Sequence, residues 1–111
     1  MSSKRELYNR LYDFYGSLMT ERQQKFFTSY YQDDYSLQEI AEEEGISRAA
    51  VSDALKHCRS ELEAYENRLH LAEKYDQRHA VYELIRSRTD DEIGRMIDQL
   101  ENIEFGGDKD E

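Results

Sequence analysis

Few side chains in this sequence could support catalysis or hold a metal ion, because the chain has three histidines and one cysteine. His57 and Cys58 are adjacent, and neighbours on a helix point about 100° apart, so they cannot pair as thiolate and imidazole. Glu66 and His70 could share a helix face, but no further cluster of ligands completes a metal site. His79 has no matched partner in the sequence. The five glycines are too scattered for a phosphate-binding loop. We therefore expect no enzymatic activity, no cofactor and no metal.

The nine tyrosines and four phenylalanines could stack on nucleic-acid bases. Proteins that bind single strands combine such aromatic residues with a positively charged groove. This chain instead has 15 Lys and Arg against 25 Asp and Glu. Because the aromatic residues recur at helical spacings, we interpret them as core or protein-interface residues, and we interpret Cys58 as a packing residue.

The segment from Leu37 to Lys56 has the spacing of a helix-turn-helix motif. Ala41 must be small where the second helix crosses above it, and Gly45 suits a tight turn that needs a positive φ angle. The other core positions are apolar and fill the wedge between the helices: Ile40, Ile46, Val51 and Leu55. The same three-helix wedge serves DNA binding and protein contacts, so the motif alone does not fix a function.

The outer side of the second helix is the candidate surface for a nucleic acid or a protein partner. It is formed or flanked by six residues: Arg48, Ala49, Ser52, Asp53, Lys56 and Arg59. On duplex DNA, Arg48 and Lys56 could contact phosphates or guanine edges, and Ser52 could hydrogen-bond to a base. Asp53 and glutamates 42–44 would face the same polyanion, although a solvated helix face is the simpler interpretation of those glutamates.

The formal net charge of −10 bears directly on the choice of partner. A DNA-binding protein without a local basic patch repels the phosphates that it must contact. Charge therefore favours a use of the motif other than DNA binding, while specific reading of the major groove stays open as the alternative.

Helix-start signals recur along the chain, and proline is absent. Four pairs match the capping box, in which a hydroxyl and a carboxyl or amide group satisfy unpaired backbone N–H groups: Ser3 and Glu6, Thr20 and Gln23, Ser36 and Glu39, Thr89 and Glu92. Ser47 can cap a further helix. With the apolar spacing, these signals predict an all-α fold with helices over about residues 4–19, 21–32, 37–44, 48–72, 75–88 and 90–104.

Two apolar surfaces predict self-association. In the long helix, apolar residues alternate at spacings of four and three: Val51, Leu55, Cys58, Leu62, Tyr65, Leu69 and Ala72. This heptad seam suits either a dimer or packing within the chain, and sequence does not separate the two. The first helix carries an apolar arc of roughly 160°, too wide for one partner helix. We expect a homodimer that uses the arc or the seam.

The length of 111 residues fits one domain, which we place at residues 1–105. Residues 106–111 have no apolar anchor and are expected to be a disordered tail. One cysteine excludes an intramolecular disulfide, and no apolar run approaches the roughly 20 residues of a membrane span. The first residues lack the apolar stretch of a signal peptide. We expect a soluble cytoplasmic protein.

Four stretches of the chain resemble the YlxM-like bacterial proteins: residues 20–23 (TERQ), 30–43 (YYQDDYSLQEIAEE), 45–51 (GISRAAV) and 65–71 (YENRLHL). They cover most of residues 5–75. That family is similar in turn to region four of primary sigma factors, in which this helix-turn-helix reads promoter DNA. The expected fold is thus a region-four-like helix-turn-helix, a long following helix and two C-terminal helices, and beyond about residue 76 only periodicity supports the prediction.

The resemblance implies a role in targeting proteins for secretion. The family is encoded beside the GTPase of the signal recognition particle and is linked to that pathway, so the particle or its GTPase is the implied partner. An acidic surface suits a basic, RNA-binding partner, because complementary charge speeds association. The similarity to sigma factors implies the alternative, a DNA-binding transcriptional regulator. Family members more often carry Gln-Ala-Val-Tyr-Asp at residues 49–53, and Ala49 replaces the glutamine that could read bases.

Overall fold

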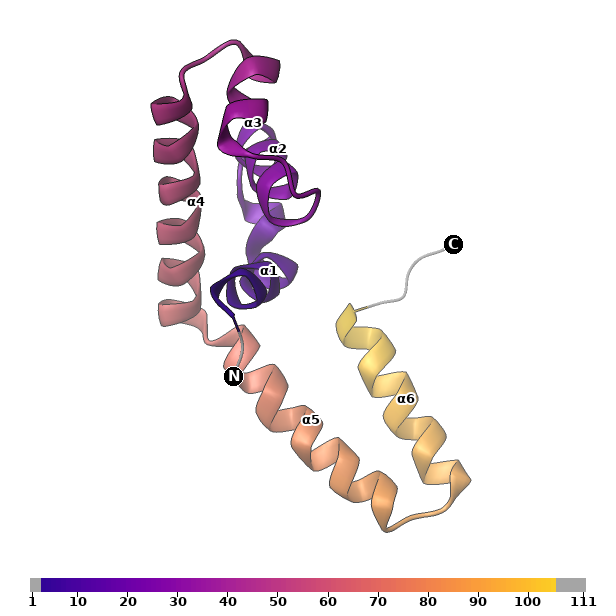
Figure 1. Ribbon diagram of the computed structural model, residues 1–111. Coiled ribbons are helices and arrows are strands. Elements are labelled where there is room, and N and C mark those ends of the chain that lie inside the picture. The colour runs from indigo at the N-terminus through magenta and orange to yellow at the C-terminus, as the bar shows by residue number, and fades with distance from the viewer. Residues whose placement is uncertain (1–2, 106–111) are drawn as a thin grey trace. The chain divides into compact units, whose positions relative to one another are not determined.

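The computed structural model describes residues 3–105, so the predicted tail at 106–111 lies outside the described residues. The described residues form helices and no strand, which confirms the all-α fold class (Figure 1). The elements are α1 (Lys4–Tyr15), the 3-10 turn η1 (Gly16–Leu18), α2 (Glu21–Tyr31), α3 (Leu37–Glu44), α4 (Arg48–Leu69), α5 (Leu71–Ser87) and α6 (Asp91–Phe105). None of these helices is long and apolar enough to span a bilayer.

The chain divides into two compact units, Met1–Ala72 and Glu73–Glu111. The first unit contains the helix-turn-helix, and the second contains nearly all of α5 together with α6. The single domain predicted over residues 1–105 stays a prediction.

Three predicted capping boxes begin the first three α-helices of the first unit. The hydroxyl groups of Ser3, Thr20 and Ser36 accept the backbone N–H three residues later, at 3.0–3.1 Å. The side chains of the residues at those third positions, Glu6, Gln23 and Glu39, accept the N–H of the cap in return. Ser47 caps α4 by accepting the N–H of Ala50, as predicted. Local sequence therefore determines where these helices begin.

The first helix is shorter than predicted, because α1 ends at Tyr15 rather than at Met19. The chain continues as η1, and Met19 then takes an extended backbone with ψ 159°. The side-chain amide of Gln24 donates to the carbonyl oxygens of Gly16 and Met19, at 3.0 Å each. An amide from α2 thus supplies the donor for carbonyl groups at the end of the first helical segment, which have no α-helical partner.

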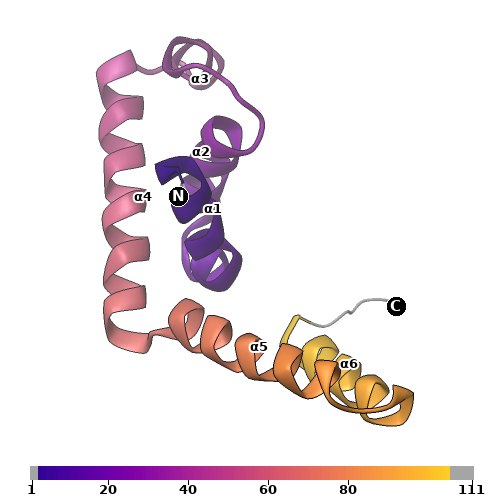
Figure 2. The same cartoon turned by 60° about the horizontal axis from the view of Figure 1, so that its bottom comes forward.

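The core of the first unit forms where α1, α2 and α3 pack along one side of α4 (Figures 1 and 2). Aromatic rings from the first two helices fill much of it. Phe27 stacks on Tyr12 and on Tyr31, with ring centroids 4.5 Å apart in each pair. The largest fully buried side chains are Tyr15, Phe27, Ile40, Leu55, Leu62, Val51 and Cys58. These aromatic residues are therefore core residues, and Cys58 is a packing residue, as predicted.

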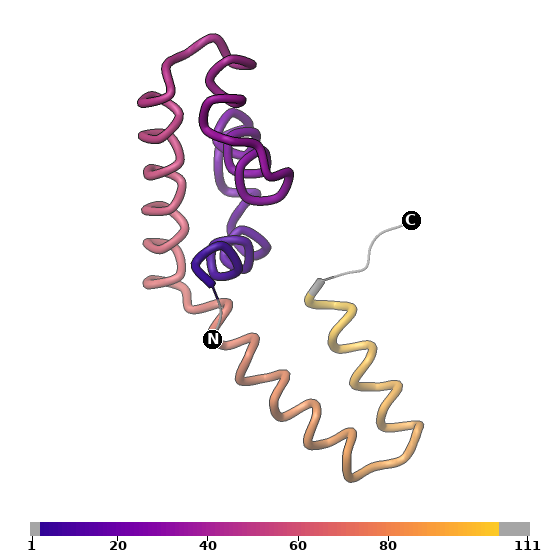
Figure 3. Tube along the Cα trace, in the orientation of Figure 1, coloured from indigo at the N-terminus to yellow at the C-terminus, as the bar shows by residue number. Residues whose placement is uncertain are grey.

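The heptad seam is used within the chain over its first four positions, since Val51, Leu55, Cys58 and Leu62 are all buried in this core. The prediction of one helix reaching Ala72 is wrong. His70 takes a left-handed backbone with φ 57°, which ends α4 at Leu69, and Figure 3 shows the interruption of the coil. A seam of seven positions for a dimer is thus excluded.

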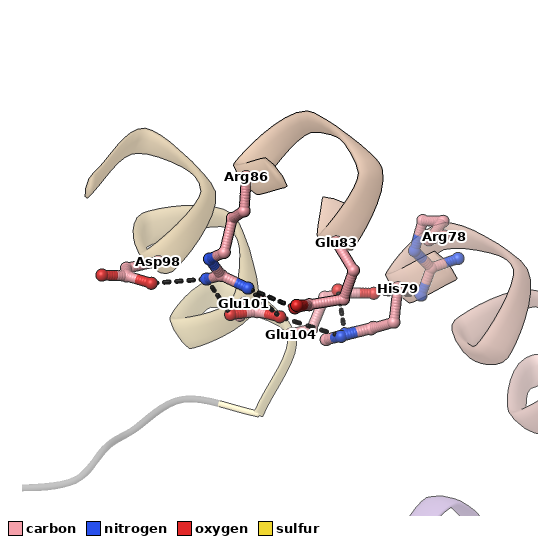
Figure 4. Close-up of polar contacts among 7 residues, drawn as sticks. All are labelled: Arg78, His79, Glu83, Arg86, Asp98, Glu101 and Glu104. Atoms are coloured by element: carbon pink, nitrogen blue, oxygen red, sulfur yellow. Dashed lines mark hydrogen bonds and ion pairs between the residues drawn. The ribbon is translucent and has the colours of Figure 1, made fainter. Parts of the chain in front are cut away.

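The second unit is a hairpin of α5 and α6 joined by a short turn, and its helices are held together by ion pairs (Figure 4). Arg86 of α5 donates to Asp98 at 2.5 Å and to Glu101 at 2.6 Å on α6. His79 Nδ1 lies 2.9 Å from the Glu101 carboxylate, and Arg78 pairs with Glu104. His79, which has no evident partner in the sequence, therefore has one in the folded hairpin.

The predicted cap of the last helix is wrong by one residue. The carboxylate of Asp90, not the hydroxyl of Thr89, accepts the N–H of Ile93 at 3.1 Å. The Thr89 hydroxyl instead donates to the carbonyl of Ile85 at the end of α5. Two adjacent residues that can both cap compete here, and the carboxylate also complements the helix dipole.

We expect the α5–α6 hairpin to open at acidic pH. The hydrogen bond from Arg86 lowers the pKa of Glu101 below its ordinary value of 4.5, with a further contribution from His79. A carboxyl with a lowered pKa stabilises the fold above its ordinary pKa, and that stabilisation is lost as pH falls through the lowered value. The protection factors of the hairpin amides, which correct for the intrinsic slowing of exchange in acid, should fall on acidification below about 4.5. A Glu101→Gln variant with the same acid response as the wild type would contradict this assignment.

Candidate functional site

The turn between α3 and α4 depends on the left-handed backbone of Gly45, which has φ 70° and ψ 33°. Its N–H donates to the carbonyl of Ala41, and the N–H of Ile46 donates to the same oxygen at 3.1 Å. This pair of bonds ends α3 and redirects the chain towards Ser47. The positive φ angle predicted for Gly45 is thereby confirmed.

Gly45→Val should lower the free energy of unfolding by about 1–3 kcal/mol, because a β-branched residue is strained in the left-handed region. No neighbouring atom lies within 4 Å of an added Cβ, so the loss would come from the backbone and not from a clash. Gly45→Asn is the matched control, because asparagine tolerates this region better than valine. Thermal unfolding at equal concentration measures both variants, and equal stability of the two would contradict the assignment.

The motif has the core that the spacing predicts. Ile40, Ala41, Val51 and Leu55 are buried, and Ile46 is half-buried against them. The small side chain of Ala41 lets α3 approach α4 closely, as expected for a helix-turn-helix. The geometry confirms the motif, and it leaves the outer face of α4 available to a partner.

The outer face of α4 presents five of the six candidate residues to solvent. Arg48, Ala49, Ser52, Asp53 and Lys56 are exposed. The sixth, Arg59, is half-buried, and its guanidinium donates to the hydroxyl of Tyr31 on α2 at 3.0 Å. Arg59, which the sequence places at the flank of this surface, therefore connects α4 to α2.

Two further residues share this surface. Asp53, Lys56, His57 and Ser60 line a shallow hollow on the side of α4. Sequence reasoning missed Ser60, and it considered His57 only as a catalytic partner of Cys58. The spacing of His57 and Ser60, four and seven residues after Asp53, would have placed them on the same helix face. We define the outer α4 surface as Arg48, Ala49, Ser52, Asp53, Lys56, His57 and Ser60.

The helix next to this surface is acidic. Glu39, Glu42 and Glu43 of α3 are exposed, as expected for a solvated helix face. Glu44 differs, because its carboxylate is half-buried and pairs with the ammonium of Lys25 at 2.8 Å. That pair raises the pKa of Lys25 and ties α3 to α2. Lys25 therefore neutralises one of the three consecutive glutamates.

Cys58 and Glu66, considered above for catalysis and metal binding, have structural roles. Burial raises the pKa of the Cys58 thiol to about 11, so it stays protonated at neutral pH, while His57 is exposed on another side of α4. Glu66 accepts hydrogen bonds from the Tyr15 hydroxyl at 2.6 Å and from the N–H of Ala72 at 3.1 Å. The Tyr15 hydroxyl also accepts the N–H of Leu71 at 3.0 Å. Tyr15 and Glu66 thus cap the first turn of α5, a role that the sequence did not reveal.

Comparison with known proteins agrees with this geometry. A family model described as "Putative helix-turn-helix protein, YlxM / p13 like" matches residues 2–103. A UPF0122 protein of Anoxybacillus flavithermus is 41% identical over 110 residues, covering 94% of this chain and all of the relative. UPF0122 proteins of Exiguobacterium sp. and Bacillus licheniformis are each 43% identical over 98 residues, covering 86% of this chain and 92% of the relative. The chain therefore belongs to the UPF0122 family of YlxM-like helix-turn-helix proteins.

Proposed function

We propose that this protein is a non-enzymatic interaction protein that binds the signal recognition particle or its GTPase and regulates protein targeting. The partner comes from the resemblance to the YlxM-like proteins, and the helix-turn-helix supplies the binding surface. The observation that carries the proposal is the balance of charge on the exposed faces of α3 and α4. In this role the protein acts in the cytoplasm, where the particle is, and as a homodimer.

The exposed charges on α3 and α4 favour a basic partner over duplex DNA. When a helix-turn-helix binds DNA, the first helix crosses the phosphate backbone and the second enters the major groove. Here the first helix would bring Glu39, Glu42 and Glu43 to the phosphates, and the second would bring Asp53. A protein surface that binds RNA is positively charged, so the same carboxylates would attract it.

The position of Arg59 supports the same conclusion. A DNA reader draws most of its affinity from lysine and arginine contacts to phosphates. Arg59 donates to Tyr31 and is half-buried, which leaves Arg48 and Lys56 as the cations of the outer α4 surface. Two cations among four exposed carboxylates would give weak binding to duplex DNA that lacks a specific sequence.

A DNA-binding transcriptional regulator is the second candidate, and one observation favours it. Arg48, Ser52 and Lys56 lie on one side of α4, within an arc of roughly 80°, and all three are exposed. These are residue types that contact phosphates and guanine edges in the major groove. Specific readout through this arc would overcome the unfavourable charge only on a matching sequence.

A binding assay that separates the two candidates compares the reconstituted particle with random duplex DNA near physiological salt. We expect tighter binding to the particle, and a DNA affinity that is low and depends weakly on salt, because few phosphates are neutralised. If the protein instead selects one duplex sequence from a random library with nanomolar affinity and does not bind the particle, this proposal is wrong. The protein would then be a DNA-binding regulator.

Charge variants identify the surface that is used. Glu42→Lys with Glu43→Lys should weaken binding to the particle and strengthen binding to random duplex DNA. Arg48→Ala with Lys56→Ala should abolish specific DNA binding by a regulator. Lys4→Ala with Arg68→Ala is its matched control, since it removes the same charge from exposed positions on other parts of the first unit. Unchanged binding of the glutamate reversal to the particle would contradict the proposed surface.

A further inference from the structure

The last helix carries an apolar stripe that α5 leaves uncovered. Met96, Leu100 and Ile103 of α6 are 50%, 43% and 79% exposed. With the half-buried Ile93 they follow spacings of three, four and three residues. That is the alternation found where two helices pack along a left-handed seam. We call these four residues the α6 stripe.

The rest of α6 is already occupied by α5. Ile97 is buried, and Asp98, Glu101 and Glu104 are bound by cationic side chains of α5 (Figure 4). On a helix, Asp98 and Glu101 lie more than roughly 90° away from Leu100 and Met96. The side of α6 that carries Asp98 and Glu101 is therefore held by ion pairs within the hairpin, and another side is apolar. Glu104, at the edge of the apolar side, is bound to Arg78.

We propose that the α6 stripe is the interface of a homodimer, in which it packs antiparallel against the same stripe of a second copy. This inference concerns the second unit alone, and it holds whether the helix-turn-helix binds the signal recognition particle or DNA. It differs from the two dimer surfaces that the sequence suggested, the apolar arc of the first helix and the seam of α4. The first four positions of that seam are buried within the chain.

The absence of charge along the stripe favours a second copy as the occupant. Two copies of a chain with net charge −10 repel each other, so they associate most readily where neither presents a carboxylate. The hollow along α6 is lined by Met96, Gln99, Leu100, Asn102 and Ile103, none of which ionises. Of the carboxylates nearest the stripe, Glu101 and Glu104 are bound to α5, and Glu92 is exposed at its N-terminal end. A basic partner would gain little from so neutral a surface.

The spacing of the stripe is also compatible with itself in the antiparallel direction. A two-fold axis that passes near residue 98 places Ile93 near Ile103 of the second copy. It also places Met96 near Leu100 of the second copy. Each position then meets a large apolar side chain, as in a two-helix seam. The stripe has four residues, far fewer than the roughly 20–30 per side of a standard interface, so we expect a dimer that dissociates in the micromolar range.

Sedimentation velocity over a range of micromolar concentrations tests the interface with the full chain. The wild type should dimerise, and Leu100→Glu should raise the dissociation constant at least about tenfold, the equivalent of about 1.4 kcal/mol. Leu18→Glu is the matched control, since Leu18 is 56% exposed but lies on η1. A monomeric wild type would overturn the proposal, as would a dimer that Leu18→Glu disrupts and Leu100→Glu does not.

Cysteine cross-linking tests the same interface without a destabilising substitution. Gln99 lies near the proposed two-fold axis, so oxidised Gln99→Cys should form a covalent dimer. Gln77→Cys, at an exposed position on α5, should remain a monomer under the same conditions. The native Cys58 is buried and should not compete. Equal cross-linking of the two variants would overturn the antiparallel pairing.

Discussion

Leu62→Ala should lower the free energy of unfolding by about 2–5 kcal/mol, the range observed when a buried leucine is truncated. Leu62 is 0% exposed and lies in the core that α4 forms with the other helices of the first unit. Truncation would leave a cavity that rigid neighbours such as Phe27 and Tyr15 can fill only partly. Chemical denaturation with a helicity readout measures the loss.

Leu69→Ala is the matched control, because it makes the same substitution at the same kind of heptad position. Leu69 is 44% exposed, so its truncation should cost much less than that of Leu62. The comparison also tests the use of the seam. If α4 formed a dimer seam along its whole length, both losses would be large and would depend on protein concentration. A large, concentration-dependent loss for Leu69→Ala would therefore contradict packing within the chain.

The helix-turn-helix was predictable because each of its signals is local. Ser36 and Glu39 satisfy each other's backbone groups within one turn, and Gly45 adopts a conformation that few other residues accept. Ile40 and Val51 are apolar at positions that face each other across the turn. Local propensity and the pattern of burial thus agree over residues 36–55, and no distant residue was needed to predict the motif.

The end of α4 was not predictable, because residues far away in sequence determine it. The heptad pattern runs through His70 without a break, and nothing in the sequence marks a left-handed residue there. The Tyr15 hydroxyl reaches across 56 positions to the N–H of Leu71, and Glu66 holds the N–H of Ala72. Such tertiary hydrogen bonds override a periodic pattern that is equally consistent with one long helix.

The candidate surface was predictable only in part, for the same reason. Helical periodicity places Arg48, Ser52 and Lys56 on the outside of α4, where the structure has them. Periodicity could not show that Arg59 bonds to Tyr31, 28 positions away, or that Glu44 pairs with Lys25. The spacing within a helix predicts the side of the helix from which a side chain projects. The partner of a long charged side chain depends instead on how the other helices pack.

Tyr15→Phe should lower the free energy of unfolding by about 2–4 kcal/mol, although it removes only one oxygen atom. The Tyr15 ring is fully buried, and its hydroxyl bonds to both the Glu66 carboxylate and the N–H of Leu71. Burial and the Glu66 bond raise the pKa of Tyr15 to about 12, so the hydroxyl stays protonated and can donate. Phenylalanine would leave a carboxylate and an N–H with one partner fewer in a half-buried site.

The loss of stability should be local as well as global, because in the wild type the Tyr15 hydroxyl caps the first turn of α5. Hydrogen exchange at residues 71–74 should accelerate more in Tyr15→Phe than exchange in the core of α4 does. Tyr35→Phe removes the same atom from an exposed ring and should change neither quantity measurably. Equal stability of the two phenylalanine variants would show that the break at His70 does not depend on the Tyr15 hydroxyl. In that case the left-handed residue itself, and not its tertiary cap, would account for the end of α4.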